Sequence, residues 1–161
     1  MDIFDFAMQK EKYSEGCYRR LAAQTANKGL QNIFTMLADE EVKHYHTVEK
    51  MKNATGPELH ETQLLAEAKS VFQQMKRAVE NFDFTLGELD AYKGAQKIEE
   101  ESRDFYLEKT AAVEDQNHKE IFQKLADEEN KHYFLLQNII EFVSRPETWL
   151  ENAEFNHLDE Y

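Results

Sequence analysis

Cysteine, proline, glycine and basic residues are all scarce in this chain of 161 residues. Its single cysteine, Cys17, excludes a disulfide framework, a Cys-x-x-Cys pair and an iron–sulfur site. With only 2 prolines and 5 glycines there are few breaks in regular structure, and 32% charged residues are typical of long helices with wet outer faces. The 19 basic residues stand against 32 acidic ones, and the net charge of −13 argues against a nucleic-acid or anionic-membrane partner.

Long apolar runs are also missing. No stretch of about 18 apolar residues is present, so we expect no membrane span. The N-terminus has no basic segment followed by an apolar run, so no signal peptide is expected. The length fits one domain with a sizeable core. We therefore expect one cytoplasmic domain over residues 1–161.

An internal repeat is the most informative feature that is present. Equivalent positions lie 88 residues apart (99 − 11 = 88; 129 − 41 = 88), and LADEE occurs at 37–41 and again at 125–129. Two long units of this kind indicate a duplicated helical hairpin and not a solenoid. The recurring polar residues are Glu11, Tyr18, Glu41 and His44 in the first copy and Glu99, Tyr106, Glu129 and His132 in the second.

Apolar residues at spacings of three and four predict four long helices, over residues 2–26, 30–53, 85–113 and 117–144. A break at 27–29 makes 2–53 one antiparallel hairpin, and 85–144 forms the second. The crossover, 54–84, keeps a helical period from Leu64 to Met75, which predicts a short helix there. The fold class is therefore all-α, a ferritin-like four-helix bundle with a long crossover. The tail, 145–161, is expected to pack on the bundle or on a second subunit.

Six of the recurring residues fall on the apolar stripes of the helices, so they point into the core. Four carboxylates in one core would repel each other, whereas two divalent cations (+4) would neutralise their charge of −4. An oxo-bridged diferric pair carries the same +4. Glu-x-x-His puts two ligands on adjacent turns of one helix face. One Glu from each of two helices and Glu-x-x-His from each of the others is the known ligand pattern of ferritin-like dimetal proteins. The candidate ligands are Glu11, Glu41, His44, Glu99, Glu129 and His132.

Oxygen and imidazole donors without thiolate favour iron or manganese and permit zinc. We expect two iron ions per chain, with positions open to O₂ or peroxide. Tyr18 and Tyr106 lie two turns after their glutamates; they are either ordinary core aromatics or hydrogen-bond donors to ligand carboxylates, and their recurrence favours the second. Glu100 or Glu101 would replace Glu99 if the register of the third helix were shifted.

Other ionisable residues near these positions are expected at the surface. The acidic residues beside the ligands do not lie on the apolar stripes of the helices. Four of the histidines have no equivalent histidine in the other copy of the repeat. The acids are Asp39, Glu40, Glu100, Glu101, Asp127 and Glu128, and the histidines are His46, His60, His118 and His157.

The segments EKYSEGCY, LADEEVKH, EEESRDFY and LADEENKH resemble the rubrerythrin family of the ferritin-like superfamily. The resemblance implies a diiron four-helix bundle, usually dimeric, that reduces hydrogen peroxide in oxidative-stress defence. It implies that the six residues named above bind iron, with Glu41 and Glu129 as bridges and with Tyr18 and Tyr106 hydrogen-bonded to the site.

The chain departs from the rubrerythrin pattern in two ways. It has no rubredoxin-like segment with two cysteine pairs, so electrons are expected from an external donor such as rubredoxin. The position one turn after Glu99 is Ser102, where rubrerythrins have a further glutamate.

The leading hypothesis is thus a peroxidase or oxidase with two irons, expected to be a homodimer in which helices could be exchanged between subunits. The alternatives are a ferroxidase that handles iron and a non-catalytic metal-binding or redox-sensing module.

Overall fold

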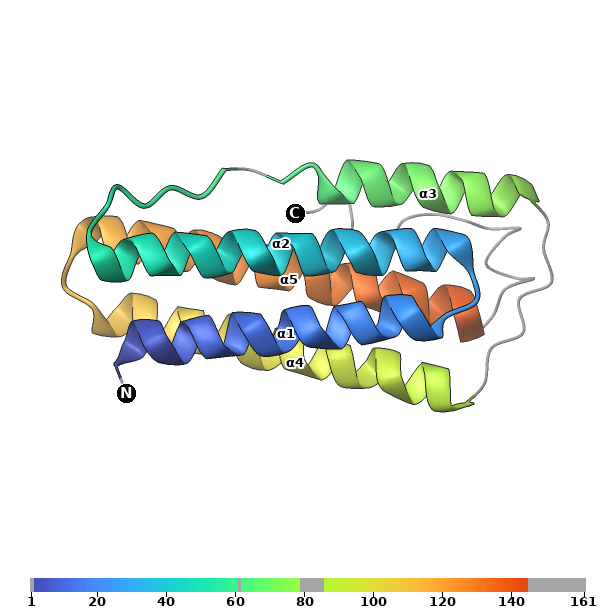
Figure 1. Ribbon diagram of the computed structural model, residues 1–161, viewed down its shortest axis with the longest axis horizontal. Coiled ribbons are helices and arrows are strands. Elements are labelled where there is room, and N and C mark those ends of the chain that lie inside the picture. The colour runs from blue at the N-terminus through green and yellow to red at the C-terminus, as the bar shows by residue number, and fades with distance from the viewer. Residues whose placement is uncertain (1, 61, 79–85, 145–161) are drawn as a thin grey trace.

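The computed structural model describes residues 2–60, 62–78 and 86–144, and within these ranges the regular structure is entirely helical. This confirms the all-α, ferritin-like bundle and the short helix in the crossover. Figure 1 shows the long helices lying side by side and a shorter one outside them. The helices are α1 (Ile3–Gln24), α2 (Lys28–Asn53), α3 (Leu64–Ala78), α4 (Leu86–Ala112) and α5 (Gln116–Ser144).

The first two helices begin at side-chain caps. Asp2 caps α1, accepting a 2.8 Å hydrogen bond from the backbone N–H of Asp5, and Asn27 caps α2, accepting a 3.0 Å bond from that of Leu30. Such caps satisfy backbone donors that a helix start leaves free. The cap at Asn27 corrects the predicted break, because residues 28 and 29 already belong to α2.

Two hairpins form the bundle: α1 packs mainly on α2, and α4 packs mainly on α5. Further contacts between α1 and α4, and between α2 and α5, join the hairpins. Since both hairpins are antiparallel, the middle of every long helix meets at the same level of the bundle (Figure 1).

Two apolar clusters fill the core on either side of that middle level. The larger includes Ile33, Phe34 and Leu37 of α2 with Leu135, Leu136 and Ile139 of α5. The smaller includes Val48 and Met51 of α2 with Ile121, Phe122 and Leu125 of α5. Fully burying one such side chain contributes about 1.5–3 kcal/mol, which helps to offset the cost of burying polar groups between the clusters.

The crossover helix α3 extends the larger cluster on one side only. Its residues Leu64, Ala68, Phe72 and Met75 are buried, and the ring of Phe72 meets that of Phe142 edge-on at 5.8 Å. A Cβ atom at Gly29 would collide with the Met75 side chain, so glycine permits this close approach.

Three expectations fall on residues that are not described: the predicted helix start at 85, the tail 145–161 and His157. Within the described ranges, no helix is both long enough and apolar enough to cross a membrane.

Candidate metal centre

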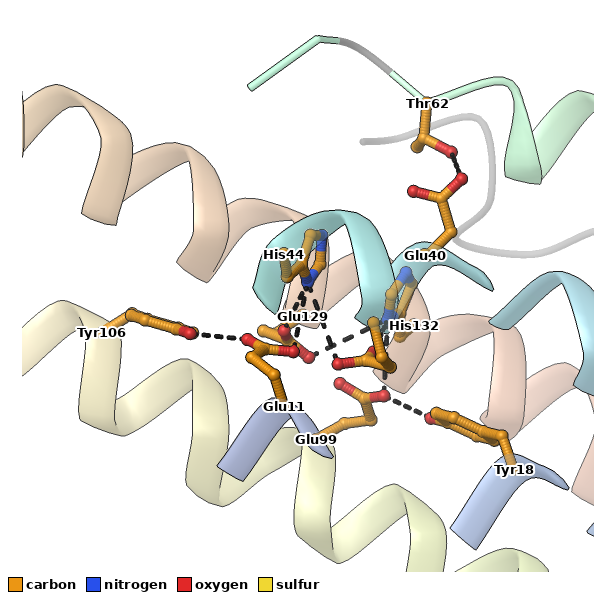
Figure 2. A network of polar contacts seen from close by, with 10 residues as sticks. Glu11, Tyr18, Glu40, His44, Thr62, Glu99, Tyr106, Glu129 and His132 are labelled. Atoms are coloured by element: carbon orange, nitrogen blue, oxygen red, sulfur yellow. Dashed lines mark hydrogen bonds and ion pairs between the residues drawn. The ribbon is translucent and has the colours of Figure 1, made fainter. Parts of the chain in front are cut away.

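The six predicted ligands come together at the middle of the bundle, between the two apolar clusters. Their exposed fractions are all 2% or less. Figure 2 shows the side chains of five of them converging, namely Glu11, His44, Glu99, Glu129 and His132. The contributors are Glu11 of α1, Glu41 and His44 of α2, Glu99 of α4, and Glu129 and His132 of α5.

The six side chains fall into two overlapping groups. Within each group, one possible ligand atom from every residue lies within 4.8 Å of the others. Glu41 and Glu129 belong to both groups, as a pair of shared carboxylates would. The first group is Glu11, Glu41, His44 and Glu129, and the second is Glu41, Glu99, Glu129 and His132.

Both histidines turn the same ring nitrogen, Nδ1, toward the carboxylates. His44 Nδ1 lies 2.9 Å from Glu129 Oε1 and 3.6 Å from Glu11 Oε2. His132 Nδ1 lies 3.0 Å from Glu41 Oε1 and 3.3 Å from Glu99 Oε1. The two rings are nearly parallel, with their centroids 5.7 Å apart and an interplanar angle of 10°. The histidine contacts therefore follow the twofold pattern of the repeat.

The recurring tyrosines donate hydrogen bonds to the carboxylates of the opposite hairpin. The hydroxyl of Tyr18 donates to Glu99, and that of Tyr106 donates to Glu11 Oε1 at 2.5 Å (Figure 2). Burial and the neighbouring Glu99 raise the pKa of Tyr18 well above its ordinary value, and burial with Glu11 does the same for Tyr106. Both phenols therefore stay protonated and able to donate.

The four carboxylates divide into two electrostatic pairs. Burial, and then repulsion from Glu11 and Glu99, raises the pKa of Glu41 well above its ordinary value. Burial, and then repulsion from Glu41 and Glu99, does the same to the pKa of Glu129. Full ionisation of all four is therefore unfavourable without a cation.

The other pair, Glu11 and Glu99, has lowered pKa values. Burial acts to raise the pKa of Glu11, but a hydrogen bond with Glu41 and the attraction of His44 outweigh it and lower that pKa to about 2. Burial likewise opposes the attraction of His132, which prevails and lowers the pKa of Glu99. Glu11 and Glu99 are thus the carboxylates that ionise most readily.

A metal pair fits the donor set. One oxygen of each carboxylate (Oε2 of Glu11, Glu41, Glu99 and Glu129) is buried without a hydrogen-bond partner. Buried polar atoms are normally satisfied, because an unsatisfied one costs about 1–3 kcal/mol. Cations among these oxygens would satisfy them and neutralise the carboxylates. The donors are oxygen and imidazole nitrogen, as iron and manganese sites use.

The expectation that all the neighbouring acids are solvated is wrong for two of them. Glu40 is only 8% exposed and Glu128 only 5%, because helix-to-helix contacts and the crossover cover them. By contrast, Asp39, Glu100, Glu101 and Asp127 are exposed. The repeat contained the signal that was missed, since positions 40 and 128 both lie within the LADEE segments.

The unpaired histidines lie away from the centre where they are described. His46 and His60 are exposed. His118 is half-buried, with its ring edge-on to Phe4 at 5.5 Å. Ser102 is buried one turn after Glu99.

Comparison with known proteins identifies the family. The model of the Rubrerythrin family matches residues 2–140, so the chain belongs to the rubrerythrin family. Searches of curated proteins and of solved structures gave no match. Rubrerythrins usually bind a diiron centre, and this membership together with the buried Glu/His cluster suggests a diiron site and an oxidoreductase-type protein.

Proposed function

We propose that this protein binds two iron ions and reduces hydrogen peroxide, or O₂, with electrons from an external donor. The observation that carries the proposal is the pair of overlapping ligand groups, buried and sharing Glu41 and Glu129. Carboxylates shared by two ions would hold a dinuclear site together, and these two are the residues common to the groups. Peroxide reduction consumes two electrons and two protons and yields two waters (H₂O₂ + 2 e⁻ + 2 H⁺ → 2 H₂O).

The proposed ligand roles follow the two groups. Glu11 and His44 would hold one ion, Glu99 and His132 the other, and Glu41 and Glu129 both. When bound, the iron pair supplies the electrons and the Lewis acidity that cleavage of the O–O bond requires. Manganese and zinc suit the same donors, so metal identity belongs to the test.

The surrounding residues would orient the ligands and exclude bulk water. Tyr18 and Tyr106 fix one oxygen each of Glu99 and Glu11 by hydrogen bonds. The apolar clusters close the bundle on both sides of the centre. Such surroundings keep water out of a reactive site and strengthen the electrostatic interactions within it.

We further propose one functional domain over residues 1–161, located in the cytoplasm and assembled as a homodimer whose long crossover lets helices be exchanged between subunits. A rubredoxin-like protein is the proposed donor. Size measurement in solution tests the dimer and separates it from the closed shell of many subunits that iron storage requires.

The test compares iron-loaded wild type with Glu41→Ala, measuring peroxide and O₂ consumption in the presence of reduced rubredoxin. Glu100→Ala is the control, because Glu100 is an exposed acid next to a proposed ligand. We expect peroxide consumption by the wild type and the control and none by Glu41→Ala. Equal consumption by all three would overturn the proposed site.

The same assay separates the alternatives. Oxidation of added Fe²⁺ without peroxide turnover would indicate a ferroxidase that handles iron. Stable iron binding with no turnover of either oxidant would indicate a metal-binding or redox-sensing module.

A further inference from the structure

A second, outer layer of carboxylates lies beside the metal centre. Glu40 and Glu128 each precede a shared glutamate by one residue, and both are nearly buried. With His44 they form a third group whose possible ligand atoms lie within 4.8 Å of one another. Because His44 Nδ1 faces Glu129 and Glu11, the ring nitrogen available on this outer side is Nε2.

Two atoms of this outer group have no hydrogen-bond partner. They are Nε2 of His44 and Oε2 of Glu128, and both are buried. The other oxygen of Glu128 is 3.4 Å from the ammonium of Lys131. The two neighbouring residues therefore each have an unsatisfied polar atom, a buried nitrogen that can donate in His44 and a buried oxygen that can accept in Glu128.

Glu40 is engaged elsewhere. Its Oε1 accepts a 2.7 Å hydrogen bond from the hydroxyl of Thr62 in the crossover and lies 3.3 Å from the ammonium of Lys43. Figure 2 shows Glu40 turned toward Thr62 and away from the converging ligands. Glu40 is thus hydrogen-bonded to the crossover, and Glu128 is the outer carboxylate that remains to interact with His44.

The chemistry of imidazole defines what Glu128 can do. A neutral ring carries one proton, so a histidine that binds metal through Nδ1 must carry its proton on Nε2. Metal-bound histidines commonly donate that N–H to a carboxylate or to water, which fixes the tautomer and the ring orientation. A cavity of about 170 Å³ is lined in part by Glu128 and Lys131, and His44 is not among its lining residues.

We propose that Glu128 positions His44 for metal binding by accepting the hydrogen bond of its Nε2–H, directly or through one water. This inference rests on the proposed metal centre and assigns Glu128 to one ion of the pair. His132 Nε2 is also without a partner, but among the described residues no such carboxylate group includes it on an outer side. The proposal therefore concerns His44 alone, in a centre whose six ligands are duplicated.

The test uses zinc, which is redox-inactive, and three variants. Glu128→Leu removes the acceptor, Glu128→Gln keeps a neutral acceptor, and Asp127→Leu makes the same change at an exposed neighbour that lines the same cavity. Calorimetric titration of the full chain with Zn²⁺ gives the affinity of each site, and nitrogen-15 NMR of the histidine rings reports the Nε2–H of His44.

We expect Glu128→Leu to weaken one of two zinc sites by about 10–100-fold, the range for losing such a partner, and to expose the His44 Nε2–H to rapid exchange. Glu128→Gln should recover part of the affinity, and Asp127→Leu should match the wild type. Equal weakening of both sites, or none, would overturn the positioning role alone. A third zinc that Glu128→Leu abolishes would overturn it in favour of an outer metal site. A wild type that binds no metal would overturn both this inference and the proposed function.

Discussion

The two hairpins are nearly interchangeable at the centre of the molecule and different elsewhere. Each supplies one glutamate, one Glu-x-x-His and one tyrosine at equivalent positions. Neither completes a site alone, because each ligand group takes three residues from one hairpin and a shared glutamate from the other. The tyrosines also reach across, from Tyr18 to Glu99 and from Tyr106 to Glu11. The centre is thus a property of the interface between the hairpins, so docking and metal binding should stabilise each other.

Outside the centre, equivalent positions have different surroundings. The ring of Phe105 packs on that of Phe6 at 5.2 Å and has Lys109 5.5 Å from its centroid. The position equivalent to Phe105 in the first hairpin is Cys17, whose sulfur accepts from Arg20. The crossover helix α3 packs mainly on α2, whereas its contact with the equivalent helix α5 includes the rings of Phe72 and Phe142. The two hairpins therefore match in the buried polar residues of the centre and differ in the residues that surround it.

The largest expected effect is the loss of metal when a shared carboxylate is removed, compared with the removal of an unshared one. Glu41→Ala should lose both metals, because Glu41 belongs to both ligand groups, whereas Glu99→Ala should lose only one. Metal content per chain, measured after loading and desalting, separates the two outcomes. Glu100→Ala should keep both metals, and identical losses in the Glu41 and Glu99 variants would refute the shared role.

The electrostatic pairing predicts how metal-free protein responds to pH. The raised pKa values of Glu41 and Glu129 mean that their contribution is present below the ordinary value of 4.5 and is lost as pH rises toward their folded-state values. The lowered pKa values of Glu11 and Glu99 mean the reverse: their contribution is present above 4.5 and is lost as pH falls, toward about 2 for Glu11.

The metal-free bundle should therefore be most stable at mildly acidic pH and lose stability as pH rises to neutral. Bound metal should reverse this trend, because protons compete with it for the carboxylates. Urea unfolding with chelator, and again with Zn²⁺, at a series of pH values tests both statements. Parallel pH curves with and without metal would show that the carboxylates do not govern the stability of the centre.

Removing the hydroxyls of Tyr18 and Tyr106 tests whether the two hairpins are equivalent at the centre. Tyr18→Phe and Tyr106→Phe each leave a buried carboxylate oxygen without its donor, at a cost of about 1–3 kcal/mol. We expect similar losses of unfolding free energy for the two variants. A Tyr133→Phe control, at a half-buried position outside the centre, should change stability little. A large difference between the losses of unfolding free energy in the Tyr18 and Tyr106 variants would show that the two tyrosines are not equivalent.

The smallest effects lie where the hairpins differ. Gly29→Ala should destabilise by about 1 kcal/mol, at the low end for overpacking, because a Cβ atom there meets the flexible side chain of Met75 in α3. Gly94→Ala should stabilise by about 0.5–1 kcal/mol, because alanine favours a helix interior and nothing lies within 4 Å of the added atom. Thermal unfolding of both variants gives the signs, and a stable Gly29→Ala variant would argue against tight packing of α3.

Much of the fold could be read from the sequence because a helical period and a repeat are redundant signals. Every long helix was predicted, with boundaries wrong by a few residues, as at Lys28, where the cap at Asn27 starts α2 earlier than expected. The period also placed Glu11 and Glu99 on core faces, where they are buried.

The burial of Glu40 and Glu128 could not be read in this way. A helical stripe records which face meets the core, but not what covers the edge of that face from a distant segment. Thr62, which is 22 positions from Glu40, supplies part of that cover. The crossed pairing of tyrosines and carboxylates likewise depends on how the hairpins dock, which spacing within one helix does not encode.

The most direct test of the central claim is the number of irons per chain after anaerobic loading of wild-type protein with Fe²⁺ and desalting. A duplicated centre that shares Glu41 and Glu129 predicts two irons per chain. One iron or none would contradict the dinuclear centre, and many irons per chain would indicate storage instead.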